Sequence, residues 1–153
     1  MPTFWRITKE RYADTAFDGE GARRFGGRWN SPGAAVVYAS ESRALALLEV
    51  LAGVGDAGLL GSYVLIPAEV GDRFLESVDP TDLDPAWARQ PPGPASQAVG
   101  DAWLRAATSA ALKVPSVLVP GEFNVVLNPA HADFGSIAVG EPIALAVDAR
   151  LYR

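Results

Sequence analysis

The segment that most constrains the fold of this chain is residues 26–33, which read GGRWNSPG. Its three glycines can adopt positive φ angles and allow a ligand or another backbone to approach closely. Arg28 adds a planar guanidinium with five donors, a group suited to phosphate or carboxylate. The segment is therefore either a binding site or a tight turn in which Trp29 fills the core and Arg28 stays in solvent.

The composition indicates one globular domain that comprises residues 1–153. The chain is 49% hydrophobic, enough for one sizeable core, and its formal net charge of -5 argues against binding to a polynucleotide. The absence of cysteine excludes disulfides, thiolate catalysis and cysteine-ligated zinc. Because the sequence shows neither a signal-like start nor an apolar stretch of membrane-spanning length, we expect a cytoplasmic protein that does not contact membranes.

The spacing of apolar residues predicts an α+β fold, a mostly β frame with two main helices. The first helix begins after Ser40, the predicted N-cap, and ends at Gly53. The second spans residues 96–113, with five side chains facing inward: Val99, Trp103, Ala106, Ala107 and Ala110. Strands are predicted at residues 4–8, 34–39 and 62–68, and in a tail interrupted at residues 120–121, 128–129 and 140–142. A loop with a short helical turn near residues 86–88 fills residues 79–94.

Four side chains outside the glycine segment are candidates for chemistry. Glu49 lies at the edge of the apolar arc of the first helix, where it is either solvated or directed into a cleft, and in a cleft it could stabilise cationic charge. Tyr38 is either a core residue or a ring that stacks on a base or holds a ribose. Ser116 lies in an apolar strand, so its hydroxyl needs a partner. We expect His131 to make a local hydrogen bond, because no nucleophile elbow accompanies it.

In their order along the chain, these segments resemble the RES-domain family, the toxin half of RES–Xre type II toxin–antitoxin modules. The family is named after an arginine, a glutamate and a serine. The matching residues and segments are Arg28, Glu49, Ser116, residues 36–41 (VVYASE) and residues 124–131 (NVVLNPAH). The resemblance covers nearly the whole chain. One departure is Gly53, where the family leads us to expect a histidine.

The resemblance implies a fold similar to ADP-ribosyltransferases and an enzyme that consumes NAD as its substrate without a metal. Some members of the family degrade NAD by hydrolysis or phosphorolysis, and at least one kind ADP-ribosylates a metabolic enzyme. Four residues take implied catalytic roles: Arg28 on the pyrophosphate, Tyr38 against the nicotinamide end, Glu49 at the ribose or its oxocarbenium ion, and Ser116 as a hydrogen-bonding group. Seven take implied roles in NAD binding: Arg6, Gly27, Arg28, Trp29, Asn30, Tyr38 and Asn124.

The family also implies a bacterial growth-arresting toxin and a partner, an Xre-like antitoxin with a helix-turn-helix domain. A second copy of the chain is another candidate partner, and we expect no direct contact with nucleic acid. Besides NAD glycohydrolase or phosphorylase activity, three alternatives stay open. They are mono-ADP-ribosyl transfer to a protein, a ribonuclease toxin, which acidity and a single histidine disfavour, and an inactive binding module.

Overall fold

A mixed sheet of eight strands forms the frame of the computed structural model, which describes residues 1–54 and 62–151. The described strands are β1 (Thr3–Lys9), β2 (Val37–Ser40), β3 (Tyr63–Glu69), β4 (Leu75–Ser77), β5 (Ala111–Pro115), β6 (Phe123–Leu127), β7 (Ala138–Val139) and β8 (Ile143–Leu145). Their order is β4-β5-β6-β2-β1-β3-β7, with β8 also paired to β3. Only the β4–β5 pair among them is parallel. This architecture confirms the predicted single α+β domain.

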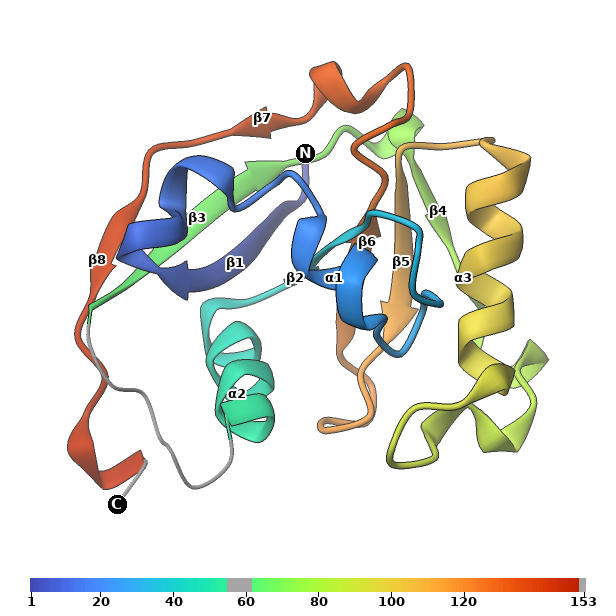
Figure 1. Ribbon diagram of the computed structural model, residues 1–153, viewed down its shortest axis with the longest axis horizontal. Helices are drawn as coiled ribbons and strands as arrows, with labels where there is room; N and C mark the ends of the chain where they lie inside the picture. Colours follow the sequence, from blue (N-terminus) through green and yellow to red (C-terminus); the bar gives the residue numbers. More distant parts are fainter. Residues whose placement is uncertain (55–61, 152–153) are drawn as a thin grey trace.

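The sheet is nearly divided where β1 meets β2. β1 pairs with β3 along seven residues, whereas it meets β2 through one register pair, Trp5 with Ser40. Figure 1 shows the result: β1, β3 and β8 lie to one side, and β4, β5 and β6 to the other. Backbone groups beyond that single pair need other partners, because a buried carbonyl without one is costly. The division therefore creates a place for polar side chains between the two parts of the sheet.

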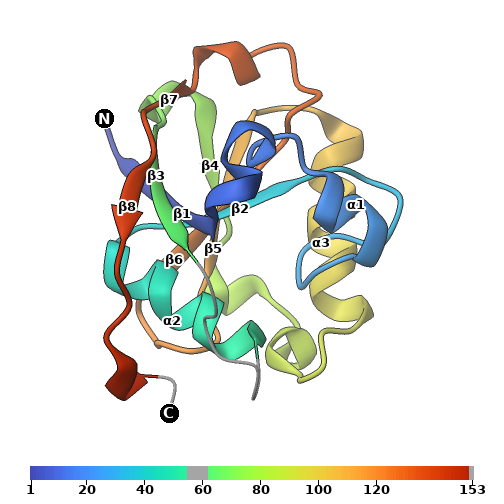
Figure 2. The ribbon, with the colours of Figure 1, turned by 60° about the vertical axis from the view of Figure 1, so that its left-hand side comes forward.

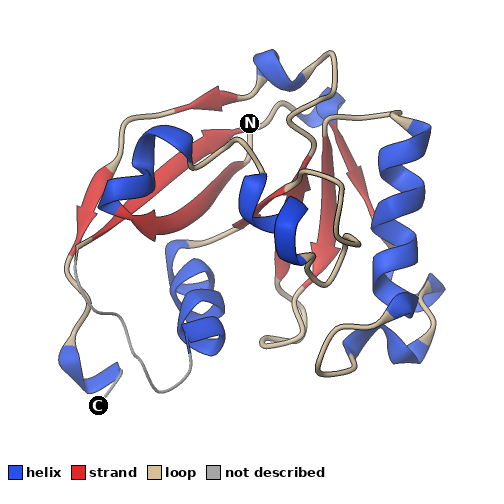
Figure 3. Cartoon of the chain, in the orientation of Figure 1, coloured by secondary structure: helices blue, strands red, loops and turns tan. Residues whose placement is uncertain are grey.

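The described residues form three α-helices, which are α1 (Glu20–Phe25), α2 (Arg43–Val54) and α3 (Pro94–Ala106) (Figure 3). The described residues also form short 3-10 helices, which are η1 (Glu10–Thr15), η3 (Asp72–Phe74), η4 (Pro80–Asp82), η5 (Pro85–Ala88), η6 (Phe134–Ser136) and η7 (Ala149–Leu151). α2 lies beside β1 and β2, and α3 lies on the far side near β4 and β5, as two views of the ribbon show (Figures 1 and 2). None of the helices in the described ranges has the length and hydropathy to span a membrane.

α3 packs so closely against the glycine segment that one position admits only glycine. A Cβ atom on Gly100 would lie 1.6 Å from the carbonyl oxygen of Trp29. Asp101, the next residue, accepts hydrogen bonds from the backbone and hydroxyl of Ser31 at 3.0 and 2.6 Å. The helix thereby fixes the backbone of residues 29–31.

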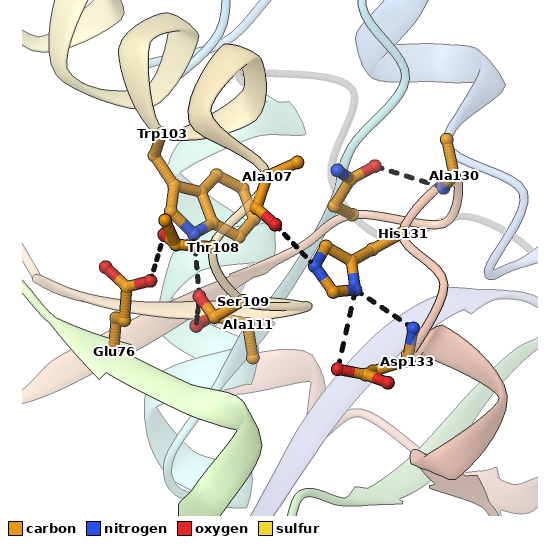
Figure 4. Close-up of polar contacts among 10 residues, drawn as sticks. Glu76, Trp103, Ala107, Thr108, Ser109, Ala111, Ala130, His131 and Asp133 are labelled. Atoms are coloured by element: carbon orange, nitrogen blue, oxygen red, sulfur yellow. Dashed lines mark hydrogen bonds and ion pairs between the residues drawn. The ribbon is translucent and has the colours of Figure 1, made fainter.

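The predicted second helix is wrong at its end. α3 stops at Ala106, and residues 111–115 form β5 instead. Ser109 explains the stop, because its hydroxyl accepts from Trp103 Nε1 at 2.9 Å and donates to the carbonyl of Ala111 at 3.1 Å (Figure 4). Trp103 and Ala110 are buried as predicted, but Ala106 and Ala107 are exposed. Alanine-rich sequence favours a helix locally, and side-chain to backbone bonds overrode that preference here.

The start and the buried face of α2 also differ from the prediction. Ser42, not Ser40, provides the cap: its hydroxyl accepts from the backbone of Leu45 at 3.0 Å. Leu45 and Ala46 are buried, whereas Leu48, one of the leucines of the apolar arc from which this helix was predicted, is 46% exposed. The helix also runs one residue beyond Gly53. The buried face of α2 is therefore rotated toward Ala46. Two further elements, α1 and β4, were not predicted from the sequence.

Candidate active site

A cavity of about 1260 Å³ opens where the sheet divides. Its walls come from β1, η1, α1, the glycine segment, β2, α2 and the turn after β5. The volume exceeds the usual range for small-molecule pockets, which is roughly 300–1,000 Å³. Among the residues proposed from the sequence, seven line the cavity: Arg6, Gly27, Arg28, Trp29, Tyr38, Glu49 and Asn124.

Glu49 is held by one of its two carboxylate oxygens. Oε1 accepts from the hydroxyl of Ser116 at 3.0 Å and from Nδ2 of Asn124 at 2.8 Å. Oε2 has no hydrogen-bond partner within the described residues. These bonds join α2 to β6 and to the residue that follows β5, and bonds to a charged group are the stronger kind. The carboxylate is thus fixed in direction while one oxygen remains available to a ligand in the cavity.

Ser116 lies behind Glu49, not in the cavity wall. The residue is 4% exposed, and its hydroxyl accepts from the backbone of Leu118 and Val119 at 3.1 and 3.3 Å. Its only proton is directed to Glu49, so the hydroxyl has no free proton or lone pair for nucleophilic attack. The predicted partner for this buried hydroxyl is therefore present, and it is Glu49.

Asn124 connects Glu49 to a further residue, Ser40. Ser40 donates its hydroxyl proton to Asn124 Oδ1 at 2.6 Å, which leaves Asn124 Nδ2 to point at Glu49. The Ser40 hydroxyl therefore sets the orientation of the amide. We predicted Ser40 as a helix cap and missed this role, because its partner lies 84 residues away and no local pattern relates the two.

Arg6 enters the cavity from β1 and donates to one backbone carbonyl of β2 and to one that directly follows η1. Its Nη1 donates to the carbonyl of Tyr38 at 3.1 Å, and its Nε donates to that of Ala16 at 2.7 Å. Burial lowers the pKa of Arg6, and the charge of Asp18 partly offsets that effect. Both hydrogen-bond partners of Arg6 are neutral carbonyl oxygens. Its Nη2 has no hydrogen-bond partner within residues 1–54 and 62–151.

Arg28 is half-buried and is held by the loop before α3. Its Nη1 donates to the carbonyls of Trp87 and Arg89, both at 2.9 Å, and its Nη2 donates to Oε1 of Gln90 at 2.8 Å. Burial lowers the pKa of Arg28, while the negative charge of Glu49 opposes the shift. These bonds argue against the alternative in which Arg28 stays in solvent, although the segment does bury Trp29 as that alternative predicted.

Tyr38 and Asn30 hold the backbone of the glycine segment. The Tyr38 hydroxyl accepts from the backbone of Trp29 at 3.0 Å and donates to Asn30 Oδ1 at 2.6 Å. Asn30 is fully buried, and its Nδ2 donates to the carbonyls of Ala22, Ser31 and Ala34 at 2.9, 3.3 and 3.2 Å. Burial, above all, raises the pKa of Tyr38 well beyond its usual range, so the hydroxyl stays protonated at neutral pH.

Gly27 allows the Tyr38 ring to approach the segment, because a Cβ atom there would lie 2.8 Å from the tyrosine oxygen. The Trp29 ring is directed into the core, where it stacks on Trp87 with 5.8 Å between ring centroids. The structure therefore brings Arg28, Tyr38 and Glu49 to one cavity, and it places Asn30 and the Trp29 ring in the packing that supports them.

His131 lies in another part of the molecule, where it makes the predicted local hydrogen bond, with Asp133, and a second contact with the more distant Ala107. Its Nε2 is 2.8 Å from the carbonyl oxygen of Ala107, and its Nδ1 accepts from the backbone of Asp133 at 2.9 Å (Figure 4). Both ring nitrogens are therefore engaged at the end of α3. Over the described ranges, no group of three or more histidine and acidic side chains could hold a metal ion.

Comparison with known proteins confirms the resemblance to the RES-domain family. Residues 3–148 match the family described as RES domain. A "Prs ADP-ribosylating toxin" of Sphingobium sp. (strain YBL2) is 39% identical, covering 99% of this chain and 97% of the relative. A "Toxin Res" of Yersinia enterocolitica is 36% identical, covering 96% of this chain and 97% of the relative.

A solved structure has the same fold. The crystal structure of the M. tuberculosis MbcT–MbcA toxin–antitoxin complex matches with a TM-score of 0.78 and 25% sequence identity, covering 94% of this chain and 83% of that chain. The family match over nearly all residues and the two relatives show that the chain belongs to the RES-domain family of toxins from toxin–antitoxin modules.

Proposed function

We propose that the chain cleaves the bond between nicotinamide and ribose in NAD and so depletes the cofactor of its host. The observation that carries this proposal is the polarity of the cavity. Arg6 and Arg28 bring positive charge held only by neutral oxygens, and Glu49 brings a carboxylate with one free oxygen. NAD has the complementary polarity, because its diphosphate is anionic and its nicotinamide ring is cationic.

The chemistry needs little from the protein beyond this arrangement. Nicotinamide leaves as a neutral molecule, so no acid has to protonate it, and positive charge develops on the ribose as the bond breaks. A carboxylate fixed near that charge stabilises the transition state more than the ground state, as in glycoside hydrolysis. Glu49 has this role in our proposal, Ser116 and Asn124 keep it in place, and the two arginines hold the diphosphate.

Transfer of ADP-ribose to a protein is the second candidate, since the Sphingobium relative carries the name of an ADP-ribosylating toxin. The same cavity serves both reactions, because they share the bond that breaks and differ only in the acceptor. Water gives ADP-ribose, inorganic phosphate gives ADP-ribose 1-phosphate, and a protein side chain gives a modified protein.

The test is to incubate the purified chain with NAD and to follow free nicotinamide by chromatography, in water, in phosphate buffer and with a bacterial lysate. Glu49→Ala and Arg28→Lys serve as variants, the latter keeping the charge but losing the planar fork. We expect nicotinamide release by the wild type and its loss in both variants. Degradation of RNA with NAD unchanged would overturn the proposal in favour of a nuclease, and inactivity toward both would favour a binding module.

A partner antitoxin would control this activity, and we propose that it does so by covering the cavity. The cavity exposes unneutralised arginine donors, which are ready partners for a carboxylate of another protein. An Xre-like antitoxin with a helix-turn-helix domain, acting in the cytoplasm, is the partner we propose on family grounds. A purified complex should neither bind nor cleave NAD, and turnover of NAD by the intact complex would rule out occlusion.

A further inference from the structure

Gln90 is the residue through which the loop between η5 and α3 reaches the cavity. Its Oε1 accepts from Arg28 Nη2 at 2.8 Å. A guanidinium can only donate, so the oxygen of the carboxamide, not its nitrogen, must face Arg28. The amide nitrogen of Gln90 has no hydrogen-bond partner in the described parts of the chain and keeps its two donors for a ligand.

Short-range contacts hold the backbone around Gln90 in place. The Asp79 and Asp84 side chains accept from the backbone of Thr81 and Ala86, both at 2.9 Å, and so fix the two 3-10 turns of the loop. The Trp87 ring stacks on the buried Trp29 ring. Residues 87–90 can therefore act as a rigid support for the Arg28 side chain, which belongs to the glycine segment and precedes them by 59–62 residues in the sequence.

This support determines which donors Arg28 can offer. Two carbonyls occupy both Nη1 protons, and Gln90 occupies one of the two on Nη2. The donors that remain are Nε–H and the second Nη2–H. Because all three partners are neutral, the positive charge of Arg28 is directed but not cancelled. On α1, Arg23 and Arg24 instead share the carboxylate of Glu20, which offsets part of their charge.

We propose that Gln90 is a positioning residue for Arg28 and that its amide nitrogen donates to the same diphosphate group of the substrate. The identity of that substrate rests on the function proposed above. A glutamine suits this place because it accepts from Arg28 with one atom and donates to an anion with the other. A carboxylate at this position would pair with Arg28 and repel the anion.

The direct test measures binding of inorganic pyrophosphate by calorimetry, a probe that contains no scissile nicotinamide. The proteins compared are the wild type, Gln90→Ala, Gln90→Glu and Ala98→Glu. Ala98 is exposed on α3 and does not line the cavity, so Ala98→Glu controls for the added charge. We expect Gln90→Ala to weaken binding about ten-fold, the scale of one hydrogen bond to a charged group. Gln90→Glu should weaken it further, and Ala98→Glu should change it less than about two-fold.

A second measurement separates this inference from the proposed function. In nicotinamide release from NAD, Gln90→Ala should raise KM while kcat and Tm stay near those of the wild type. A wild type that does not bind pyrophosphate, or Gln90 variants that bind it normally, would overturn the role of Gln90. A wild type that binds pyrophosphate through Gln90 but leaves NAD intact would overturn only the proposed function.

Discussion

The two charged walls of the cavity are built in opposite ways. In the carboxylate wall, Glu49 is held by Asn124 and, from behind the wall, by Ser116, and Ser40 holds Asn124, so side chains make the bonds that hold the carboxylate. The arginine wall consists of Arg6 and Arg28, and four of the five bonds that hold them end on backbone carbonyls. Every residue has a backbone carbonyl, whatever its side chain. The carboxylate wall should therefore be sensitive to side-chain identity, and the arginine wall to the position of the backbone.

The strongest test of this contrast is Glu49→Gln. Glutamine can still accept from Ser116 and Asn124 but cannot stabilise developing positive charge. By analogy with single preorganised groups in other active sites, we expect kcat for nicotinamide release to fall on the order of 10²–10³ with KM for NAD little changed. Glu20→Gln is the matched control, because Glu20 also lines the cavity but is paired with Arg23 and Arg24. Equal losses in both variants would contradict the assignment.

The next largest effect is expected for Asn124→Leu, which keeps the volume of the side chain roughly constant. The change removes one of the two bonds to Glu49 and leaves the Ser40 hydroxyl without its acceptor. A lost bond to a charged group costs about 1.5–3 kcal/mol, so we expect a ten- to hundred-fold loss of turnover. Ser116→Ala should give a loss of similar size, and wild-type turnover in both variants would show that Glu49 does not need this wall.

The same contrast explains how much of the site could be predicted from the sequence. Ser116 could be identified because a hydroxyl side chain in an apolar strand needs a partner, and Glu49 because it lies at the edge of the apolar arc of its helix and matches the glutamate of the family. Asn124, the second partner of Glu49, could not be assigned to it, because the pairing spans 75 residues and depends on how α2 meets β6. On the arginine wall, Arg28 was predicted from its own segment. Gln90 was missed, because no residue pattern indicates which side chain of a loop 62 residues away will accept from Arg28.

The fold, like the site, could be predicted in part from the sequence. The strands at residues 3–9 and 63–69 were found from their apolar runs, and the turns at residues 120–121 and 140–142 from their proline and glycine. The second helix was predicted seven residues too long, since local alanine content cannot reveal that Ser109 will bond Trp103 and Ala111. The division of the sheet at β1 and β2, which forms the cavity, depends on long-range pairing alone.

Tyr38→Phe should affect stability more than catalysis, because the hydroxyl bonds only the protein. Its removal leaves the Trp29 N–H and Asn30 Oδ1 without this partner, which should lower the free energy of unfolding by about 1–3 kcal/mol. Urea unfolding measures this loss, and kcat should stay within about three-fold of the wild type. A large loss of kcat with normal stability would instead place Tyr38 on the substrate.

The pH dependence of stability offers a second readout for Tyr38. Burial raises its pKa in the folded state, so its contribution is complete below about pH 10, the ordinary tyrosine value, and declines as the pH rises above it. The unfolding free energy of the wild type should therefore fall above about pH 10 more steeply than that of Tyr38→Phe. Parallel curves for the two proteins would show that the hydroxyl is not buried in solution.

The smallest effect is expected for Arg89→Ala, which tests the arginine wall where it should be most tolerant. The carbonyl of Arg89 accepts from Arg28 at 2.9 Å, and alanine presents the same carbonyl. The Arg89 side chain is exposed, so its loss removes only a charge that salt screens at physiological ionic strength. We expect KM for NAD and the affinity for pyrophosphate to change less than about three-fold, with Tm unchanged. A ten-fold rise in KM would mean that the side chain itself binds substrate, and the contrast between the two walls would fail on this side.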